Sequence, residues 1–209
     1  MAKRILVLHS GGMDSTTCLY AARAAGHDVF SLGIDYGQTL SIELDFARRQ
    51  CEAHQIRRDV IQVQWLKPVR QIPLDRDISV MNQTVSPAFL PARNVVFLSL
   101  AVAHAAGLEA EEVQIGLNCV DFSGYPDCTV EFLQSCKSMF DVAYPGGPAI
   151  SAPLLQMSKP EIARLAKSHG ISENDTWSCY RPQHMPNSTA PCGKCDACRL
   201  HEYAWNGLR

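Results

Sequence analysis

The feature that most constrains this chain is a glycine-rich segment near its beginning, residues 10–16 (SGGMDST). It follows an apolar run over Arg4–Leu8 that is typical of a buried parallel strand. It precedes a helical pattern over residues 16–25 that stops at Gly26. Two glycines let backbone N–H groups converge on one point, and the start of the helix adds partial positive charge there. The segment therefore predicts a phosphate-binding loop between a strand and a helix.

Three hydroxyl groups, those of Ser10, Ser15 and Thr16, add hydrogen-bond donors around the same point. The segment lacks the Gly-Lys-Ser/Thr ending of a Walker A loop and the G-x-G-x-x-G spacing of a dinucleotide-binding loop. The structural alternative is a plain strand-to-helix turn in which Asp14 or Ser15 caps the helix. The two serines and the aspartate favour phosphate binding over that alternative.

Further strands and helices alternate along the chain. Strand patterns cover Asp28–Asp35, residues 59–63 and residues 112–117. Helical patterns cover residues 41–54 and residues 94–106, and the second of these is apolar on nearly every face, which predicts a buried helix. This alternation predicts an α/β fold with a Rossmann-like parallel sheet and helices on both faces.

The chain is expected to divide into two parts. Residues 1–150 would form the nucleotide-binding α/β domain, and residues 151–209 a helical segment with a small four-cysteine zinc subdomain. Residues 65–91 carry four of the twelve prolines, which predicts a long loop or lid. Ser158 and Glu161 form a capping box that predicts the start of a helix in the second part.

Four of the nine cysteines lie close together near the end of the sequence, with the spacing C-x12-C-x2-C-x2-C. Two residues between cysteines let both sulfurs reach one ion, and four thiolates complete a tetrahedral zinc shell. We therefore expect one structural Zn²⁺ ion on Cys179, Cys192, Cys195 and Cys198. An iron–sulfur cluster is the competing interpretation, because it also binds cysteine sulfur.

Charge and hydropathy limit the function classes. With 19 basic and 21 acidic residues, the chain lacks the basic excess of a general polyanion binder, so we expect no nucleic-acid partner. No apolar run approaches the roughly 20 residues that span a bilayer, and the first residues lack the pattern of a secretory signal. We expect a cytoplasmic protein without a membrane partner.

Residues 10–15 resemble the Ser-Gly-Gly-x-Asp-Ser fingerprint of the pyrophosphate-loop ATP enzymes. Together with the cysteine spacing, five further segments resemble the 7-cyano-7-deazaguanine synthase family, in the same order along the chain. They are residues 35–38 (DYGQ), 90–94 (LPARN), 116–118 (GLN), 121–128 (DFSGYPDC) and 177–180 (WSCY). The resemblance runs from about residue 4 to about residue 200. It implies an adenine-nucleotide α-hydrolase-like fold that uses ATP and Mg²⁺.

The resemblance also implies a reaction. A ligase of this family converts 7-carboxy-7-deazaguanine, ammonia and ATP into the nitrile 7-cyano-7-deazaguanine, a precursor of queuosine and archaeosine. ATP would adenylate the carboxylate, ammonia would displace AMP to give the amide, and a second ATP would activate the amide oxygen before the nitrile forms. Family resemblance further implies a homodimer.

The loop chemistry and the resemblance together indicate site residues. ATP is expected on one continuous segment that includes the loop: Leu8, His9, Ser10, Gly11, Gly12, Met13, Asp14, Ser15, Thr16, Thr17 and Cys18. The substrate is expected on residues from several loops: Tyr36, Gln38, Arg93, Asn94, Asp121, Tyr125 and Asp127. Four residues are expected to be catalytic: Ser10, Asp14, Ser15 and Arg93. The structural alternatives are that Arg93 caps the following helix and that residues 125–127 form only a turn.

Two departures from the family pattern affect these expectations. Thr39 and Leu40 stand where the family usually has basic residues, which weakens the expectation of a phosphate or carboxylate contact from that loop. Ala92 stands where the family more often has glycine, which predicts a slightly different loop conformation before Arg93, because alanine resists positive φ.

Two other functions stay open at this point. One is another pyrophosphate-loop ligase, such as a tRNA-thiolating enzyme, although such enzymes usually carry an RNA-binding domain and paired catalytic cysteines. The other is a zinc-ribbon binding module whose nucleotide fold is vestigial, although the intact loop speaks against it. ATP turnover would separate the enzymes from the binding module.

Overall fold

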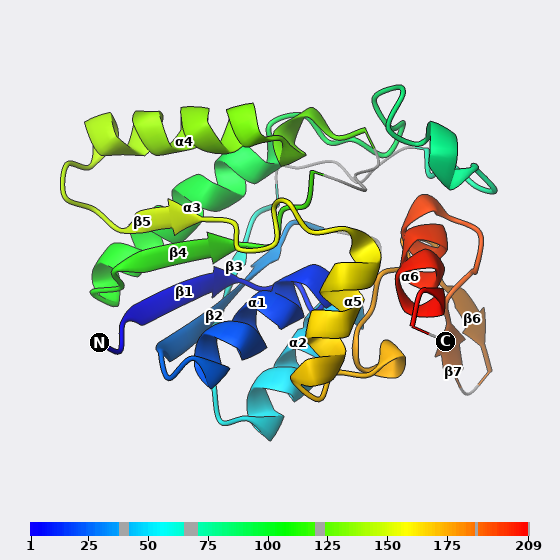
Figure 1. The fold of residues 1–209 in the computed structure, drawn as a ribbon, viewed down its shortest axis with the longest axis horizontal. Helices are drawn as coiled ribbons and strands as arrows, with labels where there is room; N and C mark the ends of the chain where they lie inside the picture. Colours follow the sequence, from blue (N-terminus) through cyan, green and yellow to red (C-terminus); the bar gives the residue numbers. More distant parts are fainter. Residues whose placement is uncertain (38–41, 65–70, 120–123, 187, 209) are drawn as a thin grey trace.

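A computed structural model of the 209-residue chain describes residues 1–37, 42–64, 71–119, 124–186 and 188–208. Five parallel strands form one sheet in the order β3-β2-β1-β4-β5 (Figure 1). These strands are β1 (Arg4–Leu8), β2 (Asp28–Asp35), β3 (Arg57–Gln62), β4 (Glu112–Ile115) and β5 (Ala149–Ser151). The central strand β1 pairs Leu6 with Phe30 of β2 on one side and with Val113 of β4 on the other.

The apolar run of β1 is explained by burial on both faces of the sheet. Successive side chains of a strand point to opposite faces. Ile5 and Val7 therefore join the core on one side, and Leu6 and Leu8 join the core on the other, each of the four at most 8% exposed. A central parallel strand must be apolar at every position for this reason.

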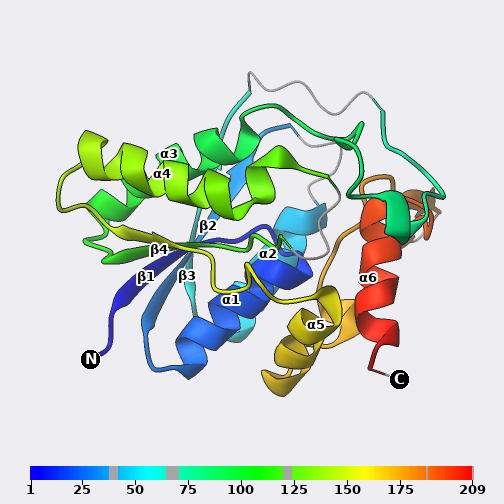
Figure 2. The ribbon, with the colours of Figure 1, turned by 45° about the horizontal axis from the view of Figure 1, so that its top comes forward.

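Helices cover both faces of the sheet (Figure 2). The core on the side of Ile5 includes residues of α1 (Met13–Ala24), α2 (Ile42–Ala53), α5 (Lys159–Ser168) and α6 (Asp196–Asn206). The core on the side of Leu6 includes residues of α3 (Arg93–Gly107) and α4 (Val130–Ala143). The predicted Rossmann-like sheet with helices on both faces is confirmed.

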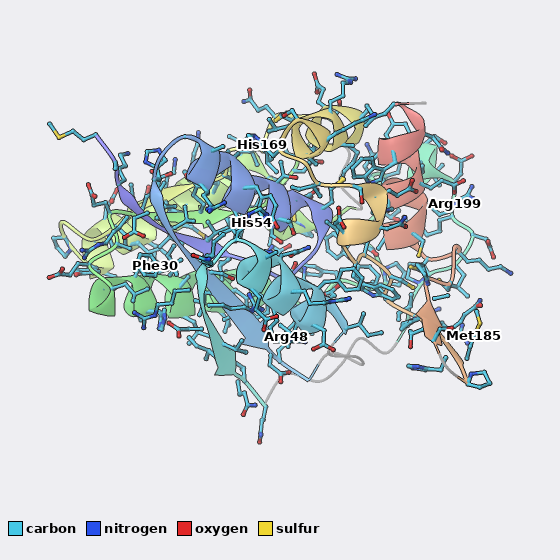
Figure 3. The ribbon with its side chains drawn as sticks, turned by 90° about the horizontal axis from the view of Figure 1, so that it is seen from below. Phe30, Arg48, His54, His169, Met185 and Arg199 are labelled. Carbon is cyan, nitrogen blue, oxygen red and sulfur yellow. The ribbon has the colours of Figure 1, made fainter. Side chains whose placement is uncertain are left out.

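Several smaller elements complete the described chain. The short helical turns are η1 (Ile78–Val80), η2 (Pro126–Cys128) and η3 (Glu173–Asp175). β6 (Gln183–Met185) and β7 (Ser188–Ala190) pair as an antiparallel hairpin, and Figure 3 shows Met185 of this hairpin far from the sheet. Among the described residues, no helix combines the length and apolar character needed to cross a bilayer.

Two predictions about elements need correction. The sequence pattern predicts four parallel strands, but β5 is a fifth, and with three residues it is too short to show a strand pattern. The prediction that residues 94–106 are buried on nearly every face is wrong. Leu98, Ala101 and Ala105 of α3 are buried, but Ala103 and Ala106 are exposed, because only one side of the helix meets the sheet.

The described part of the predicted loop or lid, residues 71–91, is anchored to the C-terminal segment. Arg76 donates to the Asp196 carboxylate at 2.8 Å and to the Met81 carbonyl at 3.1 Å. The Asp75 N–H donates to the Lys194 carbonyl at 2.8 Å. The Asp196 side chain is 1% exposed, so this ion pair is shielded from water and fixes the segment more firmly than a surface pair would.

Candidate functional site

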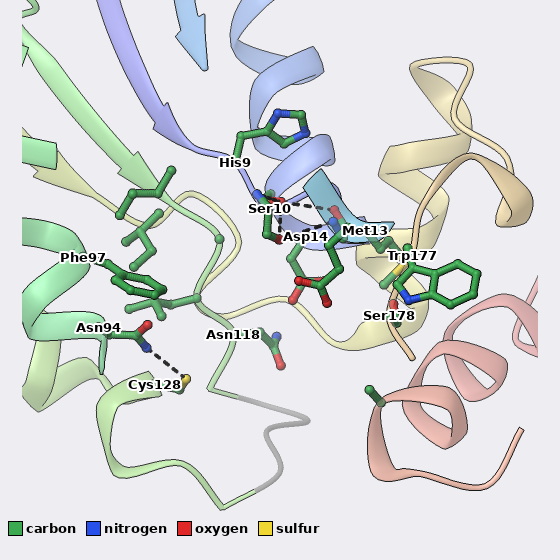
Figure 4. A pocket seen from close by; sticks show the side chains of 18 of the residues that line it. His9, Ser10, Met13, Asp14, Asn94, Phe97, Asn118, Cys128, Trp177 and Ser178 are labelled. Carbon is green, nitrogen blue, oxygen red and sulfur yellow. Dashed lines mark hydrogen bonds between the residues drawn. The ribbon is translucent and has the colours of Figure 1, made fainter. Parts of the chain in front are cut away.

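A cavity of about 310 Å³ lies at the carboxyl ends of β1, β2 and β4 (Figure 4). Ligands of open parallel sheets bind at this edge, where neighbouring connections leave toward opposite faces. Eleven of the residues expected from sequence line the cavity: Leu8, His9, Ser10, Gly12, Met13, Asp14, Ser15, Tyr36, Arg93, Asn94 and Tyr125. The fold therefore brings the glycine-rich loop and the expected substrate residues to one place.

The other expected residues are either outside the described part of the chain or absent from the cavity lining. Gln38 and Asp121 lie outside the described residues, as do Thr39 and Leu40. Among the described residues, five expected ones do not line the cavity: Gly11, Thr16, Thr17, Cys18 and Asp127. Gly11 and Thr16 belong to the loop segment itself, Thr17 and Cys18 follow it in α1, and all four are buried.

Side-chain hydroxyls hold the glycine-rich loop in its shape. The Ser10 N–H donates to Ser15 Oγ at 3.2 Å, and the Gly12 N–H donates to Ser10 Oγ at 3.3 Å. Thr16 Oγ1 donates to the Gly12 carbonyl at 2.8 Å at the start of α1. The N-terminus of this helix faces the cavity, so its partial positive charge is available to an anion.

Gly11 is required where the loop meets α2. Its φ is +94°, which L side chains rarely adopt. A Cβ at this position would lie 2.3 Å from the Glu43 carbonyl oxygen and 2.8 Å from the Ala47 nitrogen. The loop therefore packs directly on the backbone of α2.

A buried polar network around His9 supports the loop from behind. His9 Nε2 lies 2.9 Å from Gln50 Oε1, and His9 Nδ1 lies 2.9 Å from Ser31 Oγ. An amide oxygen can only accept, so Nε2 carries the proton and Nδ1 accepts from the serine hydroxyl. Burial, with a smaller contribution from the nearby Arg58 charge, lowers the pKa of His9 to about 3. The imidazole is therefore neutral and serves as a fixed hydrogen-bonding support.

Lys159 is a cavity residue that the sequence analysis did not identify. Its ammonium group lies 2.5 Å from Asp14 Oδ2, an ion pair between residues far apart in sequence. Lys159 is the first residue of α5, where the capping box of Ser158 and Glu161 forms as predicted. A lysine in the first turn of a helix interacts unfavourably with the helix dipole. This unfavourable position is the sequence signal that could have indicated a functional role for Lys159.

Arg93 and Asp127 lie close together but have different surroundings. The Arg93 guanidinium lies 5.9 Å from the centre of the Tyr125 ring, and both residues line the cavity. Asp127 instead accepts from the Asn94 N–H at 3.3 Å, at the start of α3. Burial raises the pKa of Asp127, and Arg93 opposes that shift. Asp127 therefore makes a contact at the start of a helix, and it lies in the short helical turn η2.

Ala92 adopts the left-handed conformation, with a φ of +60°, immediately before α3. The expected resistance of alanine to positive φ is therefore overcome by the surrounding loop. The conformation costs roughly 1–2 kcal/mol for a residue with a Cβ.

Glu43 is a second cavity residue that the sequence analysis did not identify. It lies in the first turn of α2 and contributes to the cavity wall. Burial raises the pKa of its carboxyl group to about 7, and the Arg93 charge opposes part of that shift. Within the described part of the chain, no side chain or backbone group hydrogen-bonds to this carboxylate.

The four predicted cysteine ligands come together as one candidate metal centre. Their Sγ atoms all lie within 4.8 Å of one another, and Cys195 Sγ lies 3.5 Å from Cys198 Sγ. Zn–S bonds of about 2.3 Å in a tetrahedron place sulfurs about 3.8 Å apart. The N–H groups of Cys192 and Lys194 point at the sulfurs of Cys179 and Cys192, a common orientation around metal-bound thiolates. The donor set fits one tetrahedral ion.

The candidate metal centre also positions part of the cavity wall. The segment between η3 and Cys179 contacts the loop, where the backbone N–H of Trp177 donates to the Gly11 carbonyl at 3.1 Å. Trp177 and Tyr180, on either side of Cys179, line the cavity. A metal ion bound by the cysteines would therefore hold two aromatic residues of the cavity wall in place, although the ion itself would lie outside the cavity.

Comparison with known proteins gives consistent results. The family described as "Queuosine biosynthesis protein QueC" matches residues 4–209. The 7-cyano-7-deazaguanine synthase 2 of Rhodopseudomonas palustris (strain HaA2) is 63% identical over 207 residues, which covers 99% of each chain. The 7-cyano-7-deazaguanine synthase of Thermosynechococcus vestitus (strain NIES-2133 / IAM M-273 / BP-1) is 35% identical over 220 residues, covering 99% of this chain and 92% of the relative.

One solved structure shares the fold at low sequence identity. A 4-thiouridine synthetase in complex with RNA and bound ATP matches with a TM-score of 0.58 and 17% identity. The match covers 91% of this chain and 44% of that chain. At this identity the similarity extends to the fold alone.

Proposed function

Because the chain belongs to the QueC family, we propose that it is a 7-cyano-7-deazaguanine synthase, an ATP-dependent C–N ligase. The observation that carries the proposal is the cavity, which joins the SGGMDS loop to a half-buried arginine and to carboxylates within one space. A binding module with a vestigial nucleotide fold would not need an intact loop at the mouth of such a cavity.

ATP would bind with its phosphates on the loop. Backbone N–H groups at the start of α1 and the hydroxyls of Ser10 and Ser15 face the space where the phosphates would lie. Lys159 would exchange part of its contact with Asp14 for phosphate oxygens, since an ammonium group is a strong phosphate partner. Mg²⁺ would screen phosphate charge, and Asp14 is the carboxylate of the loop that could hold it. We propose Ser10, Asp14, Ser15 and Arg93 as catalytic residues.

The substrate would bind across the cavity from the loop. Arg93 can pair its planar guanidinium with the carboxylate of 7-carboxy-7-deazaguanine. Tyr36 and Tyr125 provide aromatic faces for the bicyclic ring, and Asn94 provides polar atoms. For Gln38, Asp121 and Asp127 the substrate role rests on the family resemblance alone.

The reaction would then proceed by two adenylations. A carboxylate oxygen attacks the α-phosphorus of ATP, a P–O bond forms, and pyrophosphate leaves. Ammonia attacks the carboxyl carbon, the C–O bond to AMP breaks, and the nitrogen loses one proton to give the amide. The amide oxygen attacks a second ATP, and loss of AMP and two protons leaves the C≡N bond. Donors fixed before the reaction would stabilise the negative charge that develops on pyrophosphate.

Four further properties belong to the proposal. Zn²⁺ would occupy the four-cysteine centre in a structural role, because a closed sulfur shell leaves no open position for substrate. The protein would act on small molecules in the cytoplasm, without nucleic-acid or membrane partners, and as a homodimer. Residues 1–150 would supply the nucleotide site and residues 151–209 the metal centre. The two parts would divide the functions between them without being separately folded domains, because α5 of the second part shares a hydrophobic core with α1 of the first.

Incubation of the purified protein with Mg-ATP, ammonium and 7-carboxy-7-deazaguanine tests the proposal. Mass spectrometry should detect the nitrile together with AMP and pyrophosphate. ATP consumption with a different acid, and none with this one, would reject the substrate. No ATP consumption with any acid would reject the enzyme.

A further inference from the structure

The reaction proposed above needs ammonia, yet ammonium is the dominant form at neutral pH and has no lone pair for attack. A protein that uses ammonium directly must hold this small cation near the acyl adenylate and remove one of its protons. A carboxylate in the cavity, free of an internal partner, is the group that can do both.

Three acidic side chains among the described residues lie in or beside the cavity, and two of them already have partners. Asp14 is paired with Lys159 at 2.5 Å. Asp127 accepts from the Asn94 N–H at 3.3 Å at the start of α3 and does not line the cavity. Glu43 does line it, and it is the carboxylate for which the described residues provide no hydrogen-bond donor or ion-pair partner.

Glu43 also lies at the correct place for the reaction. Its backbone carbonyl packs against Gly11, so the residue is fixed beside the loop that would hold the phosphates of ATP. The acyl adenylate forms where that loop meets the substrate carboxylate on Arg93. Glu43 of α2 therefore lines the same cavity as the loop and Arg93.

The charges around Glu43 come from three elements. Arg93 of α3 contributes a positive charge, and the hydroxyls of Tyr36 after β2 and Tyr180 after Cys179 lie near enough to interact electrostatically. Burial raises the pKa of Glu43 to about 7 and raises the pKa of Tyr36, while the neighbouring Tyr125, together with burial, raises the pKa of Tyr180, so both tyrosines are neutral. A carboxyl group that titrates near neutral pH can accept a proton and release it again in each cycle.

We propose that Glu43 binds ammonium and accepts a proton from it. This inference rests on the proposed function. One N–H bond of ammonium breaks, the proton moves to the Glu43 carboxylate, and the nitrogen lone pair forms the C–N bond as the C–O bond to AMP breaks. The second proton on the attacking nitrogen passes to water. No oxidant, reductant or further reactant is needed.

The test compares Glu43→Gln with Asp45→Asn, a matched loss of one negative charge in the same first turn of α2, at an exposed position outside the cavity. Rates are measured against ammonium concentration between pH 6.5 and pH 9. General bases contribute roughly 10²–10⁴-fold, so kcat/KM for ammonium at pH 7 should fall about 100-fold in Glu43→Gln. The loss should shrink as pH rises, because free ammonia then replaces ammonium. Asp45→Asn should match the wild type.

A second measurement separates this inference from other roles of Glu43. Exchange of labelled pyrophosphate into ATP, dependent on 7-carboxy-7-deazaguanine and run without ammonium, reports adenylation alone. Glu43→Gln should show exchange with an unchanged KM for the acid. A raised KM for the acid, or an unchanged dependence on ammonium, would overturn the inference, as would a loss that persists at pH 9. If Glu43→Gln does not fold, Glu43→Asp should raise the KM for ammonium above that of the wild type. Wild-type protein without exchange would reject the proposed function itself.

Discussion

Substitution of Gly11 by alanine should damage both stability and ATP turnover, and Gly26 offers a matched control. Both glycines have positive φ, +94° at Gly11 and +84° at Gly26. A methyl group at Gly26 meets nothing within 4 Å, whereas at Gly11 it would lie 2.3 Å from the Glu43 carbonyl oxygen. The two variants share the conformational cost and differ in the steric overlap.

The magnitudes follow from that difference. Gly26→Ala should cost roughly 1–2 kcal/mol of unfolding free energy, the penalty of the left-handed conformation. Gly11→Ala should cost about 1–3 kcal/mol more, because the overlapping atoms belong to the backbone of α2 and cannot rotate away. Urea unfolding gives both free energies, and release of AMP gives the turnover. Gly11→Ala should also lose turnover, since the loop must move off α2, while Gly26→Ala should retain it. Equal destabilisation, or full turnover in Gly11→Ala, would refute the packing argument.

Three further predictions concern charge and metal. Lys159→Met should lower kcat/KM for ATP by about 10-fold or more, because the phosphate pocket loses a cation; steady-state kinetics measure this, and an unchanged value would reject the phosphate role. Because burial and then Arg58 lower the pKa of His9 to about 3, the unfolded chain binds a proton below pH 6.5 that the folded chain does not. The stability due to neutral His9 is therefore complete above pH 6.5, and the free energy of unfolding falls by up to about 1.4 kcal/mol per pH unit below it. His9→Gln should flatten this slope, measured by urea unfolding between pH 6.5 and pH 5. An equally steep slope in the variant would contradict this. Cys198→Ser should reduce zinc content, measured by elemental analysis, and lower the melting temperature; full zinc content would remove Cys198 from the ligand set.

The parts of the site that could be predicted from sequence are those whose functional residues lie close together along the chain. The loop at residues 10–16 carries its own turn residues, hydroxyls and helix start, so its structure follows from local rules. The four cysteines are similarly close in sequence, and their sulfurs meet within 4.8 Å. The alternation of strands and helices predicts the sheet and its two covered faces.

Lys159 and Glu43 could not be predicted in the same way, because their surroundings are made by tertiary packing. In the sequence, Lys159 belongs to a helix cap, and only the fold brings it to Asp14. Glu43 is one of two acidic residues in the first turn of α2, and sequence alone does not tell it from exposed Asp45. The fifth strand was missed for a different reason, since three residues cannot show a period.

The central claim is that each of the two oxygen atoms of the substrate carboxylate leaves on AMP. The most direct measurement supplies 7-carboxy-7-deazaguanine with both carboxylate oxygens isotopically labelled and locates the label by mass spectrometry. The account predicts two AMP molecules for each nitrile, each with one labelled oxygen on its phosphate, and unlabelled pyrophosphate. Label in inorganic phosphate together with ADP, or label lost to water with unlabelled AMP, would contradict adenylation of the carboxylate and the amide.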